Sequence, residues 1–256
     1  MAKIQTAERV SHLDKTDTFV YVRSLKAYAH AAELIHGKVL EIGTGSGYGI
    51  SLISPKCDEY VTLDKISVEI DKKKFPNVQF LQANVPPLEG LKDNYFDFVF
   101  LFQVIEHIPN DAALIKEIHR VLKPGGKVLM TTPNIKKTLF RNPWHIREYT
   151  VSELQKLVEK HFITARYSGV YAHGNALEYY IKNKASVHFV KRFDIFNLEK
   201  HLPSSLLKIP FDIGNRLNRL FLYKKTAHST PIADADFTIE PVSDECLDLF
   251  IIGEKK

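Results

Sequence analysis

Residues Val39 to Gly49 read VLEIGTGSGYG, with glycine at positions 43, 45, 47 and 49. An apolar run leads through Glu41 and Ile42 directly into these glycines. This pattern predicts a buried strand that runs into a loop where the backbone turns tightly and a ligand can approach it closely. The stretch is therefore the first indication of a ligand-binding site in this chain.

The spacing of the glycines separates this loop from two other glycine-rich loops. A dinucleotide-binding fingerprint counted from Gly43 requires glycine at position 48, where the chain has Tyr48. A Walker phosphate loop requires Gly-Lys followed by Ser or Thr, which the sequence lacks. What remains is an acidic residue followed by three alternating glycines: Glu41, Gly43, Gly45 and Gly47.

Composition places the chain among ordinary globular proteins. It has 256 residues, of which 45% are hydrophobic and 25% charged, enough for one substantial core plus an elaboration. Cys57 and Cys246 stand far apart, which argues against a disulfide scaffold or a cysteine zinc site and favours a reducing, cytoplasmic setting. The first residues do not resemble a signal peptide, and no run of eighteen apolar residues predicts a membrane span.

Apolar runs and helical patterns alternate along most of the chain. We expect helices over 19–35 and 111–122 and from Thr150 to about Lys160, ending in glycine, proline or charged residues. Strands are expected at 39–42, 60–63, 78–81, 96–102, 127–131, 164–170 and 246–253. Such alternation predicts an α/β fold with a mostly parallel sheet and helices on both faces, which binds its ligand at the carboxyl ends of the strands.

Four stretches in order resemble the motifs of the class I S-adenosylmethionine-dependent methyltransferases. They are the glycine loop, VTLDK (61–65), FDFVFLFQVIEHI (96–108) and VLKPGGKVLMTTPN (121–134). The resemblance covers 37–170 and the final strand. It implies a Rossmann-like, doubly wound, mostly parallel sheet of seven strands, with an antiparallel last strand and a helical insertion.

The same resemblance implies one methyltransferase domain over 1–256. Its parts would be an N-terminal helix (19–36), a cofactor-binding core (37–170 and 246–254) and a basic helical insertion or lid (173–225).

The resemblance also implies the residues that bind S-adenosylmethionine. Asp64 would hold the ribose, because one carboxylate can accept both hydroxyl protons. Asn84 stands where the family usually has an acidic residue that contacts the adenine amine, and an amide oxygen is a weaker acceptor. The expected cofactor residues are Glu41, Gly43, Thr44, Gly45, Gly47, Asp64, Lys65, Asn84, Val85 and Gln103.

Methyl transfer from a sulfonium is an in-line displacement, so the protein must align the reacting atoms and handle the acceptor's proton. Candidate catalytic groups follow the fourth and fifth strands: Glu106, His107 and His145. We expect them to share a cavity near the sulfonium, with a histidine of ordinary pKa, about 6.5, as the base. Alternatively, Glu106 and His107 simply order the loop at the start of a helix.

The pairing of EHI with a later HxREY (145–149) resembles a branch that includes quinone-biosynthesis O-methyltransferases and small-RNA 3′-end methyltransferases. In the small-RNA enzymes an ExxEH motif and a later histidine bind a divalent metal. Gln103 replaces the first of those carboxylates here, which leaves Glu106, His107 and His145 as metal ligands. Such a metal would orient an acceptor hydroxyl and lower its pKa, and both the metal-assisted and the metal-free readings stay open.

Two aromatic residues, Trp144 and Tyr149, flank this second motif. They form either a wall for an acceptor ring or sugar, or packing beneath the loop.

The basic character of the chain is concentrated late in the sequence. Residues 182–225 hold ten basic and three acidic residues, a balance of +7 against +5 for the whole chain. Pro210 is expected to start a helix there, with one apolar face and with Arg216 and Arg219 away from it. The residues of that face are Ile213, Leu217, Leu220 and Phe221.

This basic helix either buries its apolar face over the substrate pocket as a lid or lies on an anionic membrane surface, at the inner membrane face. The charge also suits nucleic acid, but no RNA-binding module is recognisable, and we do not expect nucleic acid as a partner.

We therefore expect a methyltransferase that uses S-adenosylmethionine to methylate a hydroxyl of a small molecule, a glycan or a lipid-linked intermediate. The alternatives are a metal-assisted RNA 3′-end 2′-O-methyltransferase and a non-catalytic cofactor-binding protein. The sequence identifies neither the acceptor nor the oligomeric state.

Overall fold

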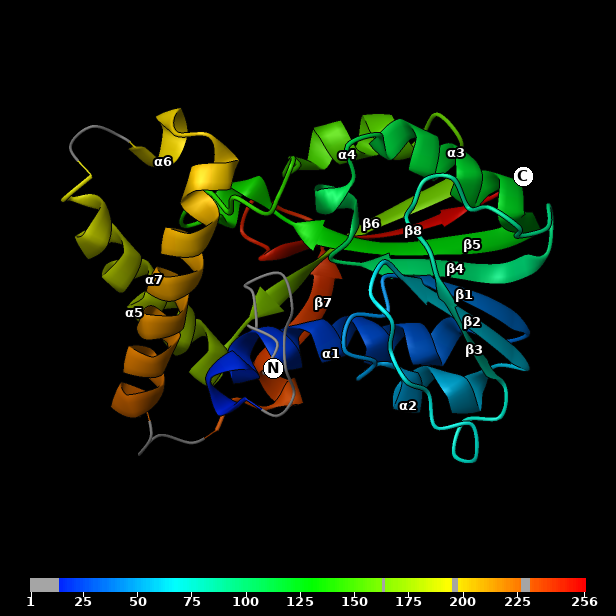
Figure 1. Cartoon of the computed structure of the whole chain (residues 1–256), viewed down its shortest axis with the longest axis horizontal. Coiled ribbons are helices and arrows are strands. Elements are labelled where there is room, and N and C mark those ends of the chain that lie inside the picture. Colours follow the sequence, from blue (N-terminus) through cyan, green and yellow to red (C-terminus); the bar gives the residue numbers. More distant parts are fainter. Residues whose placement is uncertain (1–13, 163, 195–197, 227–230) are drawn as a thin grey trace.

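The computed structural model describes residues 14–162, 164–194, 198–226 and 231–256. They form an eight-stranded sheet in the order β3-β2-β1-β4-β5-β8-β6-β7, with helices on both faces and a helical projection at one end (Figure 1). The strands are β1 (Lys38–Ile42), β2 (Glu59–Asp64), β3 (Val78–Gln82), β4 (Phe96–Phe102), β5 (Leu122–Pro133), β6 (Thr164–Ala172), β7 (Phe237–Pro241) and β8 (Asp248–Glu254).

The first five strands form the parallel half of the sheet. β1 pairs with β2 and β4, β2 with β3, and β4 with β5, all parallel. The centre of β4 is an unbroken apolar run of fully buried residues, as expected for a strand covered on both faces. The strand order reverses between β1 and β4, so the glycine loop after β1 lies at the switch point, where open α/β sheets bind ligands.

The other half of the sheet is antiparallel. β8 lies between β5 and β6 and runs antiparallel to both, which confirms the predicted antiparallel last strand. The count of seven strands was wrong, because β7 adds an eighth at the edge, paired with β6. Phe237 is the buried residue of this short strand, which ends in a proline, so its sequence carried little strand signal.

Helices cover both faces of the sheet (Figure 1). On one face, α1 and the short α2 pack residues such as Tyr28 and Ile53 against Val39 and Phe100. On the other face, α3 and α4 pack against a second apolar cluster. The helix bounds are α1 (Thr18–Leu34), α2 (Ile50–Ile53), α3 (Asp111–Val121) and α4 (Val151–Val158). The expected helices in these regions are therefore present, with ends that differ by a few residues at most.

The late basic segment is helical and projects from one end of the sheet (Figure 1). It comprises α5 (Gly174–Lys191), α6 (Leu198–His201) and α7 (Ser204–Thr226) and connects β6 to β7. Pro210 does not start a helix as predicted. It lies inside α7, which begins six residues earlier and continues past the missing N–H.

Among the described residues, no helix is both long enough and apolar enough to cross a membrane. The expectation about a signal peptide concerns residues 1–13, and part of the predicted insertion falls on 195–197. Both stretches lie outside the described residues.

Candidate functional site

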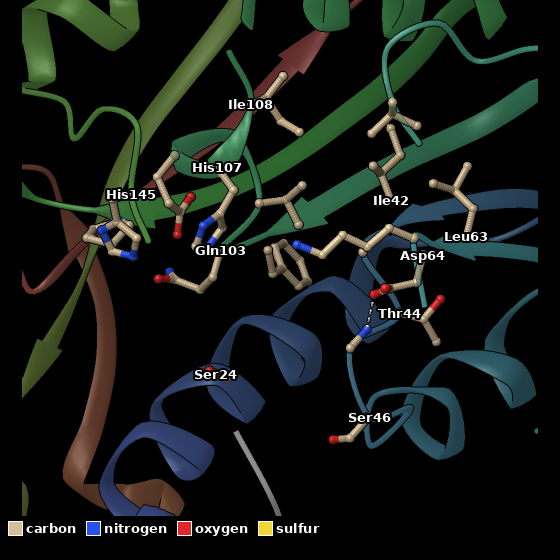
Figure 2. Close-up of a pocket in the computed structure, with 18 of the residues that line it drawn as sticks. Ser24, Ile42, Thr44, Ser46, Leu63, Asp64, Gln103, His107, Ile108 and His145 are labelled. Carbon is tan, nitrogen blue, oxygen red and sulfur yellow. Dashed lines mark hydrogen bonds between the residues drawn. The ribbon is translucent and has the colours of Figure 1, made fainter. Parts of the chain in front are cut away.

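A cavity of about 450 Å³ opens at the carboxyl ends of the parallel strands. Figure 2 shows Thr44, Ser46 and Asp64 at one end of it, and Gln103, His107 and His145 at the other. Of the expected cofactor residues, the lining includes Gly43, Thr44, Gly45, Asp64, Lys65, Asn84, Val85 and Gln103.

The glycine loop leaves open space in the cavity. Gly43, Gly45 and Gly47 all have positive φ angles, which other residues rarely adopt. A Cβ atom added at Gly43 would lie 2.4 Å from the Val104 side chain, so this glycine is required by packing. A Cβ atom at Gly45 would meet no atom within 4 Å, so this glycine faces space that a ligand can fill.

Asp64 is held at the end of β2 by two backbone groups. Its Oδ2 accepts from the Gly45 N–H at 2.9 Å and its Oδ1 from the Ile66 N–H at 2.9 Å. The carboxylate is therefore fixed against the glycine loop, where it lines the cavity.

Glu41 lies beneath the loop and does not line the cavity, and neither does Gly47. The Glu41 carboxylate accepts from the hydroxyls of Tyr28 (2.6 Å), Tyr60 (2.6 Å) and Thr62 (2.5 Å). Burial raises its pKa above the ordinary value, although these three hydroxyls act in the opposite direction. Glu41 therefore supports the loop from below through a network of hydroxyl groups.

Helix α1 contributes residues that sequence reasoning missed. Tyr28, Ser24 and Arg23 all line the cavity from this helix. Arg23 lies against Asp248, with its Nε 3.1 Å from Oδ2 of that buried carboxylate. Residues 20, 23, 24 and 28 share one face of α1 because of their helical spacing. The sequence does not show which other element that face contacts.

Gln103 ends β4 in a strained conformation. Its φ of 58° lies in the left-handed region, which is uncommon for residues other than glycine, and strain of this kind concentrates at functional sites. Its backbone N–H donates to the Thr131 carbonyl at 3.0 Å and its side-chain amide donates to the Thr131 hydroxyl at 3.2 Å. Gln103 is thus fixed where the chain turns from β4 into the loop that carries Glu106 and His107.

Glu106 is a fully buried carboxyl group at the reacting end. One oxygen, Oε2, accepts from the Thr132 hydroxyl at 3.0 Å, while Oε1 has no hydrogen-bond partner among the described residues. Burial raises the pKa of Glu106 to about 7, against the lowering effect of His145. The group is therefore close to half ionised at neutral pH, as befits an acid–base or ligand position.

The two histidines lie edge to face, with ring centroids 4.9 Å apart. His107 Nδ1 lies 2.9 Å from the Trp144 carbonyl, which can only accept, so Nδ1 carries the proton and Nε2 is the basic nitrogen. His145 Nδ1 lies 2.6 Å from Glu148 Oε1 and its Nε2 lies 2.8 Å from the Asn142 amide. The structure thus orients His145 through both nitrogens.

These residues meet the first requirement of a metal site. One ligand atom from each of Glu106, His107 and His145 lies within 4.8 Å of the others. Glu106 Oε1 is buried and has no hydrogen-bond partner among the described residues. Two imidazoles and a carboxylate suit a first-row divalent ion. The set fits a metal, although His145 Nε2 would have to give up its contact with Asn142.

A second cavity, of about 430 Å³, adjoins the first. Asn142, His145, Arg23 and Arg219 are among the residues that line both. The second cavity extends beneath the helical projection, with Val187 and Val190 of α5 and with residues of α7. Those α7 residues are Leu207, Pro210, Phe211, Gly214, Asn215, Asn218 and Arg219.

Neither Trp144 nor Tyr149 lines either of these two cavities, so packing beneath the loop, the second of the two expected alternatives, describes them. Tyr149 is buried and its hydroxyl donates to Asp111 at 2.8 Å. Trp144 donates its indole N–H to Asp212 of α7 at 3.0 Å. Both side chains fasten the loop that carries His145.

Comparisons with known proteins agree with this geometry. A family model described as "Methyltransferase domain" matches residues 40–130. A "Probable S-adenosylmethionine-dependent methyltransferase" of Mycolicibacterium smegmatis is 34% identical over 164 residues, 60% of this chain and 63% of that protein. A "Ubiquinone biosynthesis O-methyltransferase" of Acinetobacter baylyi is 26% identical over 121 residues, 44% of this chain and 48% of that protein.

A crystal structure from Thermotoga maritima, a "SAM-dependent methyltransferase, possible histamine N-methyltransferase", shares the fold. Its TM-score is 0.52 with 17% identity, over 93% of this chain and 92% of that one. The sequence matches are shorter: the chain spans less than two thirds of the length of the curated relatives it matches.

Proposed function

Since the core of this chain belongs to the class I S-adenosylmethionine-dependent methyltransferases, we propose that the protein transfers a methyl group from S-adenosylmethionine to a hydroxyl oxygen of an acceptor held in the second cavity. The observation that carries this proposal is the junction of the two cavities at Asn142 and His145. A donor in the first cavity and an acceptor in the second would meet beside Glu106 and His107. Such alignment is the main task of an enzyme for an in-line displacement.

The cofactor supplies an already activated methyl group when bound, so the protein needs to hold both partners and manage one proton. Asp64 and the open space at Gly45 support binding of the ribose and methionine portions. His107 is the proposed general base, because its Nδ1 proton is held by the Trp144 carbonyl and its Nε2 is basic. His145, whose ring nitrogens are held by Asn142 and Glu148, would position the acceptor hydroxyl only by exchanging its Asn142 contact for it.

The acceptor is proposed to have an apolar part. Val187, Val190, Leu207 and Phe211 give the second cavity an apolar lining, which polar residues such as Asn142, His145 and Asn183 interrupt. This distribution suits a hydroxyl on an amphipathic molecule, such as a quinone precursor or a lipid-linked glycan, better than a small polar acceptor. The relative named as a ubiquinone-biosynthesis O-methyltransferase supports a hydroxyl oxygen as the methyl acceptor.

Gly214 offers a test that separates acceptor binding from folding. It lies inside α7, lines the second cavity, and an added Cβ would meet no atom within 4 Å. Gly214→Phe should fill part of the cavity and abolish methyl transfer from labelled cofactor to lipid and quinone fractions, while calorimetry with S-adenosylhomocysteine shows unchanged affinity.

Gly214→Ala is the matched control. It should retain transfer and gain stability, because alanine is the better helix former by about 1 kcal/mol. If the parent protein binds cofactor but methylates no fraction, the proposal fails and a non-catalytic cofactor-binding role replaces it. Equal activity of Gly214→Phe and the parent would also contradict the placement of the acceptor.

A second candidate, metal-assisted transfer, is favoured by the clustering of Glu106, His107 and His145 within 4.8 Å. In this version a bound divalent ion would lower the pKa of the acceptor hydroxyl and hold a vicinal diol, as at the 3′ end of an RNA. Gln103 weighs against it, because an amide bonded to Thr131 stands where the small-RNA enzymes have a carboxylate.

Calorimetric titration with Mn²⁺ alone distinguishes the two versions. Binding by the parent that is lost in His107→Gln would favour the metal-assisted version, whereas absence of binding together with chelator-resistant turnover would favour His107 acting alone. Salt-sensitive binding of short RNA would be required for the RNA acceptor.

A further inference from the structure

The outward face of α7 is apolar and exposed to solvent. Its large side chains recur every three or four residues and so form one stripe along the helix. Ile209 is 72% exposed and Leu217 is 61% exposed. The stripe, called the α7 stripe below, consists of Leu206, Ile209, Ile213, Leu217, Leu220 and Phe221. Single exposed apolar residues are ordinary, but six at helical spacing mark an interaction surface.

The packing of the opposite face of α7 shows that the α7 stripe does not cover the second cavity. Leu207 and Leu222 are buried on that inner side, and Phe211 and Gly214 line the second cavity there. Of the two alternatives for this face, burial of Ile213, Leu217, Leu220 and Phe221 over the pocket is therefore excluded. α7 covers the cavity with one face and presents the α7 stripe to solvent with the other.

The contact between α5 and α7 is partly polar. Ser186 donates to Asn218 Oδ1 at 2.7 Å, and Asn218 donates to Asn183 Oδ1 at 2.7 Å. These hydrogen bonds join the two helices, while several large apolar side chains of both helices remain exposed. α5 adds exposed apolar groups of its own, including Phe189 and Phe193, whose rings lie 5.4 Å apart.

Basic residues accompany the exposed apolar groups. Exposed cations on these helices include Lys184, Arg192, Lys224 and Lys225. Nearby acidic groups are engaged within the protein: Glu178 pairs with Lys182 at 2.6 Å, and Glu199 pairs with Lys191 at 2.8 Å. The projection therefore combines exposed apolar surface with an excess of positive charge.

Arg216 and Arg219 pair with acidic groups of the protein itself. Arg216 pairs with Asp14, and Arg219 lies 2.5 Å from Asp17, which is buried. These ion pairs fasten the flank of α7 to the residues before α1. Substituting the two arginines would test this attachment and not the binding of a surface.

We propose that the α7 stripe, with the neighbouring cations of α5 and α7, docks the protein on the surface of an anionic lipid bilayer. The apolar side chains would enter the boundary between headgroups and acyl chains while the lysines meet the anionic headgroups. The positive charge favours an anionic lipid surface over a second copy of the chain as the partner of the α7 stripe. Two copies would bring two basic faces together, and these would repel each other. The inference does not depend on the proposed methyl transfer.

Vesicle flotation tests the docking surface. The parent protein should bind vesicles of phosphatidylcholine with 30% phosphatidylglycerol at low salt, bind pure phosphatidylcholine weakly, and lose binding as salt increases. Ile213→Ser with Leu217→Ser should reduce the partition coefficient roughly tenfold. Lys224→Glu with Lys225→Glu should reduce it by at least about 25-fold, because each lysine near an anionic surface contributes about fivefold.

Two matched controls lie elsewhere on the molecule. Leu34→Ser alters an exposed leucine at the end of α1, and Lys73→Glu with Lys74→Glu reverses an exposed lysine pair between β2 and β3. Both should bind vesicles like the parent, and every variant should keep the parent's circular dichroism and affinity for S-adenosylhomocysteine. No parent binding to the anionic vesicles, or equal losses in the controls, overturns the proposal. A concentration-dependent dimer lost in Ile213→Ser with Leu217→Ser would also overturn it and assign the stripe to a second copy.

Discussion

Replacing Glu106 with glutamine should make the stability of the protein depend differently on pH. Glu106 is fully buried, and burial raises its pKa from an ordinary 4.5 to about 7. The folded state therefore binds the proton more tightly than the unfolded state does. The free energy of unfolding should fall as pH rises from about 4.5 to about 7 and level off above that range.

The size of this effect follows from the pKa difference. A shift of one unit corresponds to about 1.4 kcal/mol, so ionisation of Glu106 should cost the folded state about 3 kcal/mol by pH 8. Glutamine has the shape of the protonated carboxyl, can still accept from Thr132, and cannot ionise. Relative to the parent, Glu106→Gln should thus gain about 2.5 kcal/mol between pH 5 and pH 8, because part of the effect is already present at pH 5.

Urea unfolding followed by circular dichroism at pH 5, 6.5 and 8, with chelator present, measures this difference. The exposed Glu89→Gln serves as the control and should show a constant offset from the parent. A Glu106→Gln offset that does not change with pH would refute the placement of Glu106 in a desolvated site. If Mn²⁺ binds there, it should reverse the parent's trend, because metal ligation favours the ionised carboxylate.

Three further results are expected. Gly45→Val should abolish binding of S-adenosylhomocysteine, as measured by calorimetry. Gly90 has a similarly positive φ and equally open surroundings, so Gly90→Val is the control and should bind normally. Equal losses of binding in the two variants would mean that backbone strain explains both. His107→Asn should lower kcat by 100-fold or more without changing cofactor affinity, and an unchanged kcat would remove it as the base. Tyr60→Phe should destabilise the protein by roughly 1–3 kcal/mol in urea unfolding, because it deprives the buried Glu41 carboxylate of a donor; a change near zero would show that the other two hydroxyls suffice.

The sequence alone determined the parallel half of the sheet and the glycine loop at its switch point, whereas the antiparallel final strand was implied by the family resemblance. These features are encoded by neighbouring residues: apolar runs of strand length, and glycines at positions whose backbone angles are positive. Eight of the ten expected cofactor residues line the cavity for the same reason, since the carboxyl ends of adjacent parallel strands lie at one edge of a sheet. The approach of His107 to His145 followed from the order of the strands.

The tertiary structure decided what depends on contacts between distant parts of the chain. Tyr28 of α1 reaches Glu41 beneath the glycine loop, and Asp17 pairs with Arg219 from near the other end of the chain. The edge strand β7 depends on its pairing with β6 and is weakly encoded in its own sequence.

The direction in which an amphipathic helix turns its apolar face also lies outside the sequence pattern. Periodicity shows that such a face exists, but which neighbour covers it depends on the packing of other elements. In α7 the inner face meets the second cavity and the α7 stripe faces solvent. The raised pKa of Glu106 is decided in the same way, because desolvation depends on every atom packed around a group and not on its neighbours in the chain.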